Sequence, residues 1–230
     1  MRGPDRAAAA RPRGRRGGSG LVKVVLATNN AKKLIELRRV CEGLGVEVLG
    51  LADVASYPEP AETETTFDGN ALLKARACVA ATGLPALADD SGIAVDALNG
   101  MPGVRSARWA GPGEGDEANL RLLLRQLTDL DGVRRGAQFV CALALVTPDG
   151  TEHVTRGVMP GRLATEPAGQ NGFGYDPIFV PEGDQRTTAE LTAAEKDAIS
   201  HRGQAIRAML PRLAELAGSA ERAQQAEENR

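Results

Sequence analysis

Apolar positions along the chain follow two spacings: continuous runs, as in buried strands, and stripes that repeat every three to four residues, as in amphipathic helices. The continuous runs predict strands over residues 21–27, 46–49, 138–147, 151–159 and 161–165. The stripes predict a helix that begins near residue 31 and further helices over residues 70–82, 116–127 and 192–217. Strands and helices that alternate in this way predict an α/β fold.

Residue types at the helix ends support these boundaries. Gly83 is placed to cap the second helix, and Thr192 with Glu195 predicts a capping box at the start of the last helix. Pro211 is expected to bend or interrupt that last helix. The polar residues 218–230 are expected to form a frayed C-terminal tail.

The stretch over residues 84–98 carries two short apolar runs that close on the adjacent carboxylates Asp89 and Asp90. It predicts a strand, a sharp turn and a second strand. Because successive side chains of an extended chain point to opposite faces, we expect the two carboxylates to have different roles. Carboxylates among apolar residues require a positive or hydrogen-bonding partner, and Mg²⁺ would meet that need. The alternative is a plain β-turn, since Asp, Ser and Gly all favour turns.

Two neighbouring segments suit a phosphate ligand. A glycine-rich loop over residues 99–103 leads to Arg105 and Arg108, whose cations could share the charge of a polyphosphate ester with a metal ion. Residues 28–33 join a strand to a helix, and free amides at such a junction can hold an anion with help from the two lysines there. A solvated charged loop and an ordinary capped helix are the alternatives.

A flat ligand is suggested by the segment over residues 169–177, where glycines alternate with Phe173 and Tyr175. Glycine lets backbone approach such a ligand closely, while an aromatic ring stacks on it. The last helix adds polar residues that lie off its buried stripe, namely Lys196, Ser200, His201 and Arg202.

The bulk composition narrows the function classes. With 230 residues, 42% hydrophobic and 25% charged, the chain can form one large domain or two lobes. A net charge of −2 and 3% aromatics argue against a nucleic-acid surface, so we expect a small-molecule ligand. The longest apolar run, residues 139–146, is far too short to span a bilayer, so no membrane association is expected.

Three cysteines lie far apart in sequence without metal-ligand spacing, which indicates reduced core residues of a cytoplasmic protein. The two histidines are too few for a histidine-rich zinc site. Residues 1–20 are Arg, Ala, Gly and Pro with little apolar content, so we expect a disordered extension before a single domain over residues 21–217.

Together these stretches closely resemble the inosine/xanthosine triphosphate pyrophosphatase family, from about Val22 to Leu213. The motifs that carry the resemblance are residues 28–33 with Glu36, 62–75 with Lys74, 88–92, 102–108, 172–177 and 200–203. The resemblance implies a long twisted mixed sheet flanked by helices, with two lobes around a central nucleotide-binding cleft. It also implies Mg²⁺ dependence and a homodimer. The family often has glycine at the positions of Asn29 and Lys32.

The resemblance also implies roles for individual residues. Glu62 and Asp90 would hold Mg²⁺, and Asp90 would accept the proton of the attacking water. The triphosphate would be gripped by Thr28, Asn29, Asn30, Ala31, Lys32, Lys33 and Ser91. The base would be contacted by Phe173, Gly174, Tyr175, Asp176, Lys196, His201 and Arg202.

The implied substrates are ITP, dITP and XTP, cleaved to the monophosphate and pyrophosphate so that they are kept out of DNA and RNA. A 6-keto purine offers an acceptor oxygen to Lys, His and Arg donors, whereas adenine offers an amino donor there. An unpaired buried polar group costs roughly 1–3 kcal/mol, so each such contact discriminates about tenfold or more. GTP shares the 6-keto group, so its rejection requires exclusion of the 2-amino group. The alternatives are a pyrophosphatase for modified pyrimidines and a nucleotide sensor without turnover.

Overall fold

The computed structural model describes residues 21–229, apart from the side chains of Lys32, Glu227 and Glu228. The expected disordered extension over residues 1–20 lies outside the described residues. A six-stranded sheet has the order β2-β1-β3-β4-β5-β6, with β1 parallel to β2 and β3 and the other neighbours antiparallel. Its strands are β1 (Val22–Leu26), β2 (Val46–Leu49), β3 (Ala86–Val95), β4 (Gly136–Val146), β5 (Glu152–Leu163) and β6 (Phe179–Pro181). The predicted α/β fold with a mixed sheet is confirmed.

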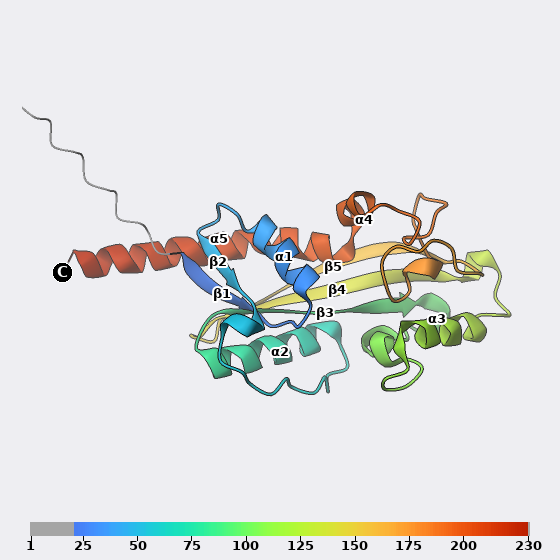
Figure 1. The fold of residues 1–230 in the computed structure, drawn as a ribbon, viewed down its shortest axis with the longest axis horizontal. Coiled ribbons are helices and arrows are strands. Elements are labelled where there is room, and N and C mark those ends of the chain that lie inside the picture. The colour runs from blue at the N-terminus through green and yellow to red at the C-terminus, as the bar shows by residue number, and fades with distance from the viewer. Residues whose placement is uncertain (1–20, 230) are drawn as a thin grey trace, which may run out of the picture.

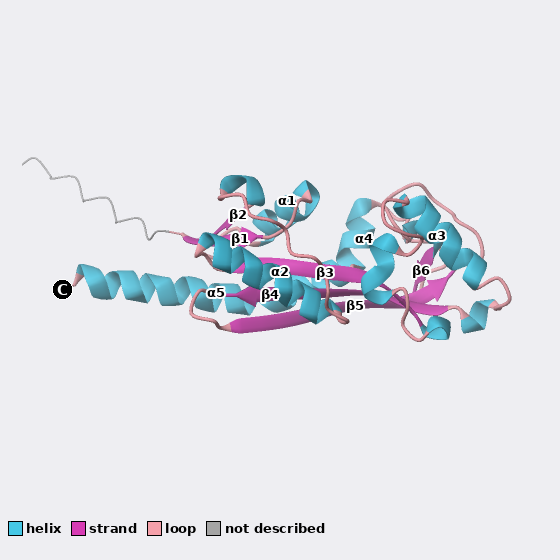
Figure 2. Ribbon diagram, turned by 90° about the horizontal axis from the view of Figure 1, so that it is seen from below, coloured by secondary structure: helices cyan, strands magenta, loops and turns pink. Residues whose placement is uncertain are grey.

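Helices cover both faces of this sheet. The helices are α1 (Ala31–Val40), α2 (Phe67–Thr82), α3 (Gly115–Gln126), α4 (Ala193–Ile199) and α5 (His201–Glu228). Apolar residues of α1 and α5 pack on one face, and α2 packs on the other through an alanine-rich cluster (Figure 1). The long strands β3, β4 and β5 run on into a second lobe with α3 and β6, which has its own core (Figure 2). Within residues 21–229, no helix has the length and apolar character needed to cross a membrane.

The turn predicted at Asp89 and Asp90 is wrong, because β3 runs unbroken from Ala86 to Val95 and pairs with β4 along its whole length. Gly92, which suggested the turn, instead allows close packing. A Cβ atom at Gly92 would lie 2.4 Å from the Ser106 hydroxyl oxygen and 2.5 Å from the Gly103 carbonyl oxygen. Long pairing therefore overrides the local preference of Asp, Ser and Gly for turns.

The separate strand predicted over residues 161–165 is also wrong, because β5 continues through Pro160 to Leu163. Gly161 serves the close approach of β6 here, since a Cβ atom would lie 2.3 Å from the Val180 carbonyl oxygen. Pro160 has no backbone N–H and cannot donate a hydrogen bond, but its carbonyl accepts one from the backbone N–H of Glu182 at 2.9 Å. Both residues therefore fit inside a paired strand.

The single helix predicted over residues 192–217 is two helices, α4 and α5, separated by extended backbone at Ser200. The Ser200 hydroxyl accepts the N–H of Gly203 at 3.0 Å and so starts the second helix. Pro211 lies within α5 without ending it, and α5 continues to Glu228. Residues 218–228 of the tail expected to be frayed are therefore helical and project beyond the sheet (Figure 1). The predicted capping box of Thr192 and the Gly83 cap, with φ of 69°, are both present.

The three cysteines are buried and free, as predicted for reduced core residues, at positions Cys41, Cys78 and Cys141.

Candidate active site

The site lies where strand β1 ends beside the longer strand β3. Pairing between the two strands stops at Leu26 and Leu87, while β3 continues toward Asp89 and Asp90. The chain turns away after β1 to begin α1, which leaves this edge of β3 open. A cavity of about 500 Å³ occupies the position. Its lining residues are Ala27, Thr28, Asn29, Asn30, Lys33, Glu59, Lys74 and Asp89.

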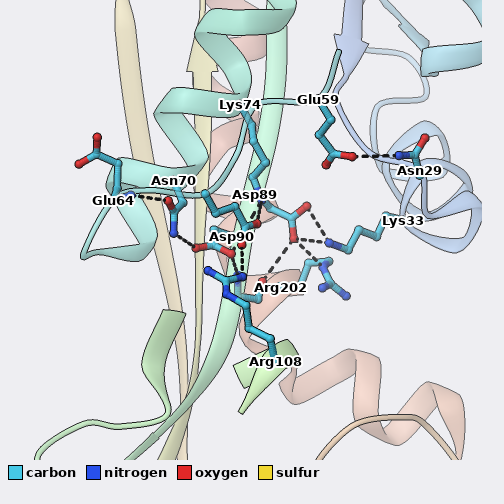
Figure 3. Close-up of polar contacts among 12 residues, drawn as sticks. Asn29, Lys33, Glu59, Glu64, Asn70, Lys74, Asp89, Asp90, Arg108 and Arg202 are labelled. Atoms are coloured by element: carbon cyan, nitrogen blue, oxygen red, sulfur yellow. Dashed lines mark hydrogen bonds and ion pairs between the residues drawn. The ribbon is translucent and has the colours of Figure 1, made fainter. Parts of the chain in front are cut away.

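Asp89 and Asp90 point to opposite faces of the sheet, as strand alternation predicts (Figure 3). The Lys33 ammonium donates to the two Asp89 carboxylate oxygens at 2.9 and 2.8 Å, and Arg202 Nε donates to Oδ2 at 3.4 Å. Burial raises the pKa of Asp89, but the charges of Lys33 and Arg202 outweigh it and hold that pKa well below its usual range. Asp89 is therefore an ionised anchor for two cations from distant segments. Ser91 also donates its hydroxyl to Asp89, at 3.3 Å.

Asp90 faces α2 and has a different environment. The Asn70 amide nitrogen donates to Asp90 Oδ2 at 3.0 Å, and the Ser91 N–H donates to Oδ1 at 3.1 Å. Burial raises the pKa of Asp90 by more than the nearby Lys74 charge and the Asn70 hydrogen bond lower it. A carboxylate with a raised pKa is a stronger base, so this side chain suits proton acceptance.

Glu62 completes a two-carboxylate group around the ammonium of Lys74. Lys74 Nζ lies 3.0 Å from Glu62 Oε1 and 3.8 Å from Asp90 Oδ1, and Arg108 donates to Glu62 Oε2 at 2.7 Å. Burial raises the pKa of Glu62, but the Arg108 hydrogen bond and the Lys74 charge bring it below the usual value. Lys74 is not a solvated surface lysine, because its side chain is 12% exposed and ion-paired.

These two carboxylates fit a magnesium ion. The ammonium that they share marks a position favourable to a cation. Among the described residues, no three His, Cys, Asp or Glu side chains are grouped to hold a metal. Mg²⁺ is usually bound by one or two carboxylates together with water and substrate phosphates, so two protein ligands suffice.

The segment before α1 is arranged as a helix cap, as predicted. The Thr28 hydroxyl accepts the N–H of Asn30 at 3.2 Å, and the Asn30 side chain accepts the N–H of Lys33 at 3.4 Å. Asn29 donates to the Glu59 carboxylate at 3.3 Å across the cavity (Figure 3). Ala31 is the first residue of the helix. The predicted role of the Lys32 side chain falls outside the described side chains.

Asp176 holds the loop over residues 169–177, which is predicted to bind the base, through its side-chain contacts. This buried carboxylate accepts the N–H of Phe173 at 2.8 Å and the Thr188 hydroxyl at 2.8 Å, and it pairs with Lys196. The Phe173 ring is 60% exposed, with the Lys196 ammonium 5.3 Å from its centroid. An exposed ring on a fixed loop is available for stacking.

Two further residues of this loop have different surroundings. The Gly174 N–H donates to Asp116 at 2.8 Å. The Tyr175 ring is buried in the second-lobe core, and its hydroxyl donates to the Ser106 carbonyl at 2.8 Å. Tyr175 therefore holds the loop in place, and its contact with a nucleotide stays a prediction.

His201 begins α5 and stacks on Phe139, with ring centroids 5.1 Å apart. Burial, and then the charges of Arg202 and Lys196, lower the pKa of His201 to about 3, so the ring is neutral at pH 7. Its Nδ1 atom is buried and has no hydrogen-bond partner among the described residues. A ligand group is one way to satisfy such an atom.

Two residues of the site were not assigned a role from the residues alone, namely Asn70 and Lys74. Asn70 and Lys74 lie four positions apart on α2, a spacing that places both on one helix face. That spacing was visible in the sequence, but nothing local showed that the face meets Asp90.

The model of the Ham1 family matches residues 24–212. A dITP/XTP pyrophosphatase of Corynebacterium efficiens is 58% identical over 206 residues, which cover 86% of this chain and 100% of that protein. One of Frankia alni is 60% identical over 202 residues, covering 85% of this chain and 98% of that protein.

Solved structures agree with this result. The crystal structure of a nucleoside-triphosphatase / dITP/XTP pyrophosphatase from Mycobacterium abscessus superimposes with a TM-score of 0.73 at 59% identity, covering 83% of this chain and 100% of that one. A HAM1 protein from Coxiella burnetii gives a TM-score of 0.80 at 43% identity, covering 84% of this chain and 99% of that one. The resemblance inferred from the motifs is confirmed, and the chain belongs to the Ham1 family.

Proposed function

We propose that this protein hydrolyses the non-canonical purine nucleoside triphosphates ITP, dITP and XTP to the nucleoside monophosphate and pyrophosphate. The observation that carries the proposal is the pair of adjacent carboxylates at the open edge of β3, Asp89 and Asp90, which point to opposite faces of the sheet. One carboxylate anchors Lys33 at the phosphate-binding turn, and the other faces Glu62 and Lys74 with a raised pKa. Relatives that match over nearly their whole length are dITP/XTP pyrophosphatases, which supports the same reaction here.

The reaction is proposed to depend on Mg²⁺, held by Glu62 and Asp90. When bound, the ion neutralises phosphate charge and makes the phosphorus more open to attack. Asp90 accepts a proton from the attacking water, whose oxygen bonds to the α-phosphorus. The bond from that phosphorus to the oxygen bridging it to the β-phosphorus breaks, and pyrophosphate leaves with the bond electrons. Lys33 stabilises the phosphates at the turn before α1.

The base is proposed to stack on Phe173, beside Lys196, His201 and Arg202. Lys196 and Arg202 are donors toward a 6-keto oxygen. Because His201 is neutral, it offers one N–H donor and one acceptor nitrogen. Adenine would face these donors with its amino group, and the unpaired donors would disfavour it.

A homodimer in the cytoplasm is the proposed form of the enzyme, and its proposed role is to remove these nucleotides before polymerases incorporate them. Its substrate partner is a small-molecule nucleotide.

A substrate panel tests the proposal. Pyrophosphate release is measured from ITP, dITP, XTP, GTP, dTTP and a modified pyrimidine triphosphate, with Mg²⁺ and with excess chelator. We expect turnover of the first three that the chelator abolishes. Equal turnover of ITP and GTP would contradict the substrate assignment, preference for a modified pyrimidine would indicate the related pyrophosphatase, and binding without turnover would indicate a sensor.

A further inference from the structure

Asn70 is a fully buried polar residue in the first turns of α2, with 0% of its surface exposed. Its backbone N–H is bonded to the Thr66 carbonyl at 3.1 Å, so the helix itself does not need the side chain. A buried amide is costly unless its donors and acceptor are paired. The partners of this side chain therefore show what it does.

The two ends of the Asn70 amide reach two different segments. Its oxygen accepts the backbone N–H of Glu64 at 3.0 Å, and its nitrogen donates to Asp90 Oδ2 at 3.0 Å (Figure 3). Because an N–H can meet only the oxygen and a carboxylate only the nitrogen, the orientation of the amide is determined.

These two segments carry the two carboxylates of the proposed metal site. Glu64 lies two residues after Glu62, and Asp90 is the second carboxylate itself. The segment also rests tightly on the helix, since a Cβ atom at Gly69 would lie 2.7 Å from the Glu64 Cβ atom. The Asn70 amide is thus a short link between the backbone that bears Glu62 and the side chain of Asp90.

The link also fixes the plane of the Asp90 carboxylate, so that the oxygen not held by Asn70 faces the cation position. Oδ2 is held by Asn70, and Oδ1 is the oxygen 3.8 Å from Lys74 Nζ. Lys74 lies one helical turn after Asn70 and contacts both carboxylates. A partial rotation of the Asp90 carboxylate about its Cβ–Cγ bond would break the Asn70 hydrogen bond.

We propose that Asn70 is a positioning residue that sets the separation and orientation of the Glu62 and Asp90 carboxylates, and so determines how tightly a divalent cation binds between them. This role rests on the proposed metal-dependent function. Leucine fills nearly the same volume but makes neither hydrogen bond. Aspartate would place a second carboxylate against Asp90. Asparagine alone among these three supplies both the acceptor and the donor.

The test compares Asn70→Leu with wild type and with a matched control, Thr82→Val. Thr82 lies at the other end of α2, where its hydroxyl donates to the Cys78 carbonyl at 2.8 Å and accepts the Leu84 N–H at 3.2 Å. Binding of Mn²⁺, which shares the preference of Mg²⁺ for carboxylate oxygens, is measured by electron paramagnetic resonance without nucleotide. The Mg²⁺ concentration for half-maximal ITP turnover is measured in parallel.

Loss of a residue that orients a metal ligand typically weakens metal binding about 10–100-fold. We expect Asn70→Leu to weaken Mn²⁺ binding and raise the Mg²⁺ requirement by about tenfold or more, with turnover recovering at high Mg²⁺. Thr82→Val should lower the melting temperature and leave both metal values at wild-type levels.

Wild-type metal values in Asn70→Leu would overturn the proposal, as would an equal shift in Thr82→Val. If Asn70→Leu does not fold, Asn70→Ser is measured instead, with the same expected direction and the same refuting result. Wild-type enzyme that binds Mn²⁺ but releases no pyrophosphate would refute the proposed function, while the Mn²⁺ comparison would still decide the role of Asn70.

Discussion

Replacement of Asp90 by asparagine separates the catalytic role of this residue from its structural role. The new side chain keeps the shape, and its oxygen can still accept the Asn70 N–H that Asp90 Oδ2 accepts at 3.0 Å. It loses the negative charge and the basicity. General-base assistance contributes about 10²–10⁴-fold in rate, so we expect ITP turnover to fall at least about a hundredfold, which equals about 2.7 kcal/mol of barrier.

The effect of Asp90→Asn on stability is expected to be small. Burial raises the pKa of Asp90, which means that the fold disfavours the ionised form. Ionised Asp90 therefore lowers stability increasingly as pH rises through its pKa, and the substitution removes that cost. In the other direction, an amide nitrogen placed near the Ser91 N–H loses one hydrogen bond, worth about 1 kcal/mol. These opposing changes leave the unfolding free energy within about 1 kcal/mol of wild type.

The assay is pyrophosphate release from ITP at saturating Mg²⁺, together with urea unfolding at pH 7. Asp68→Asn is the control, because Asp68 lies on α2 and pairs with Arg156 through two 2.7 Å hydrogen bonds on the surface. Loss of that surface pair should cost about 0–1 kcal/mol and leave turnover unchanged. Near-wild-type turnover in Asp90→Asn would refute the assignment, and Glu62 would become the next candidate for the base.

Three further predictions address the base pocket and the cation position. Phe173→Ala should raise the KM for ITP about fivefold or more, since base stacking on an aromatic ring is worth about 1–3 kcal/mol. It should not change the melting temperature, because the ring is 60% exposed; a lower melting temperature with an unchanged KM would contradict this. His201→Gln should flatten the pH dependence of the free energy of unfolding. The fold lowers the pKa of His201 from about 6.5 to about 3, so its neutral ring contributes fully to stability above pH 6.5. That contribution is lost as pH falls toward 3, by at most about 1.4 kcal/mol per pH unit. Urea unfolding at pH 7 and pH 5 checks this, and an equal pH dependence in the two proteins would count against it. Lys74→Met should bind Mn²⁺ more tightly than wild type, because the ammonium competes for Glu62 and Asp90; weaker binding in a titration would show that Lys74 supports the site instead.

Features decided by neighbouring residues were predictable from the sequence. The Thr192 and Glu195 capping box, the Gly83 cap and the cap before α1 depend on contacts within a few positions, and all are present. The spacing of apolar residues within each segment likewise indicated whether the segment forms a strand or a helix. The motif order likewise identified the family.

Features decided by distant residues were not predictable. Lys74 lies 12 positions from Glu62 and 16 from Asp90, and nothing in its own neighbourhood distinguishes it from a surface lysine. The Asp-Asp-Ser-Gly segment favours a turn locally, yet β4 pairs with every residue of β3. For β3, the pairing with β4 outweighs a local conformational preference of about 1 kcal/mol or less.

The continuous strand explains why adjacent aspartates can have different chemistry. Residues facing α1 and α5 are large, and Asp89 pairs in register with Leu143 on that face. Residues facing α2 are mainly alanines, and Asp90 pairs with Ala142 there. Small side chains on both the sheet and the helix let α2 approach closely, which brings Asn70 and Lys74 to Asp90.

A shift of one residue in the pairing of β3 with β4 would exchange the two faces. Asp90 would then meet the cations that hold Asp89, and Asp89 would face α2. The alternation of large and small buried side chains opposes this shift, because Leu87 would be forced into the alanine-lined layer against α2. The assignment of one carboxylate as an anchor and the other as a base is therefore fixed by the sizes of core side chains as much as by the charged residues themselves.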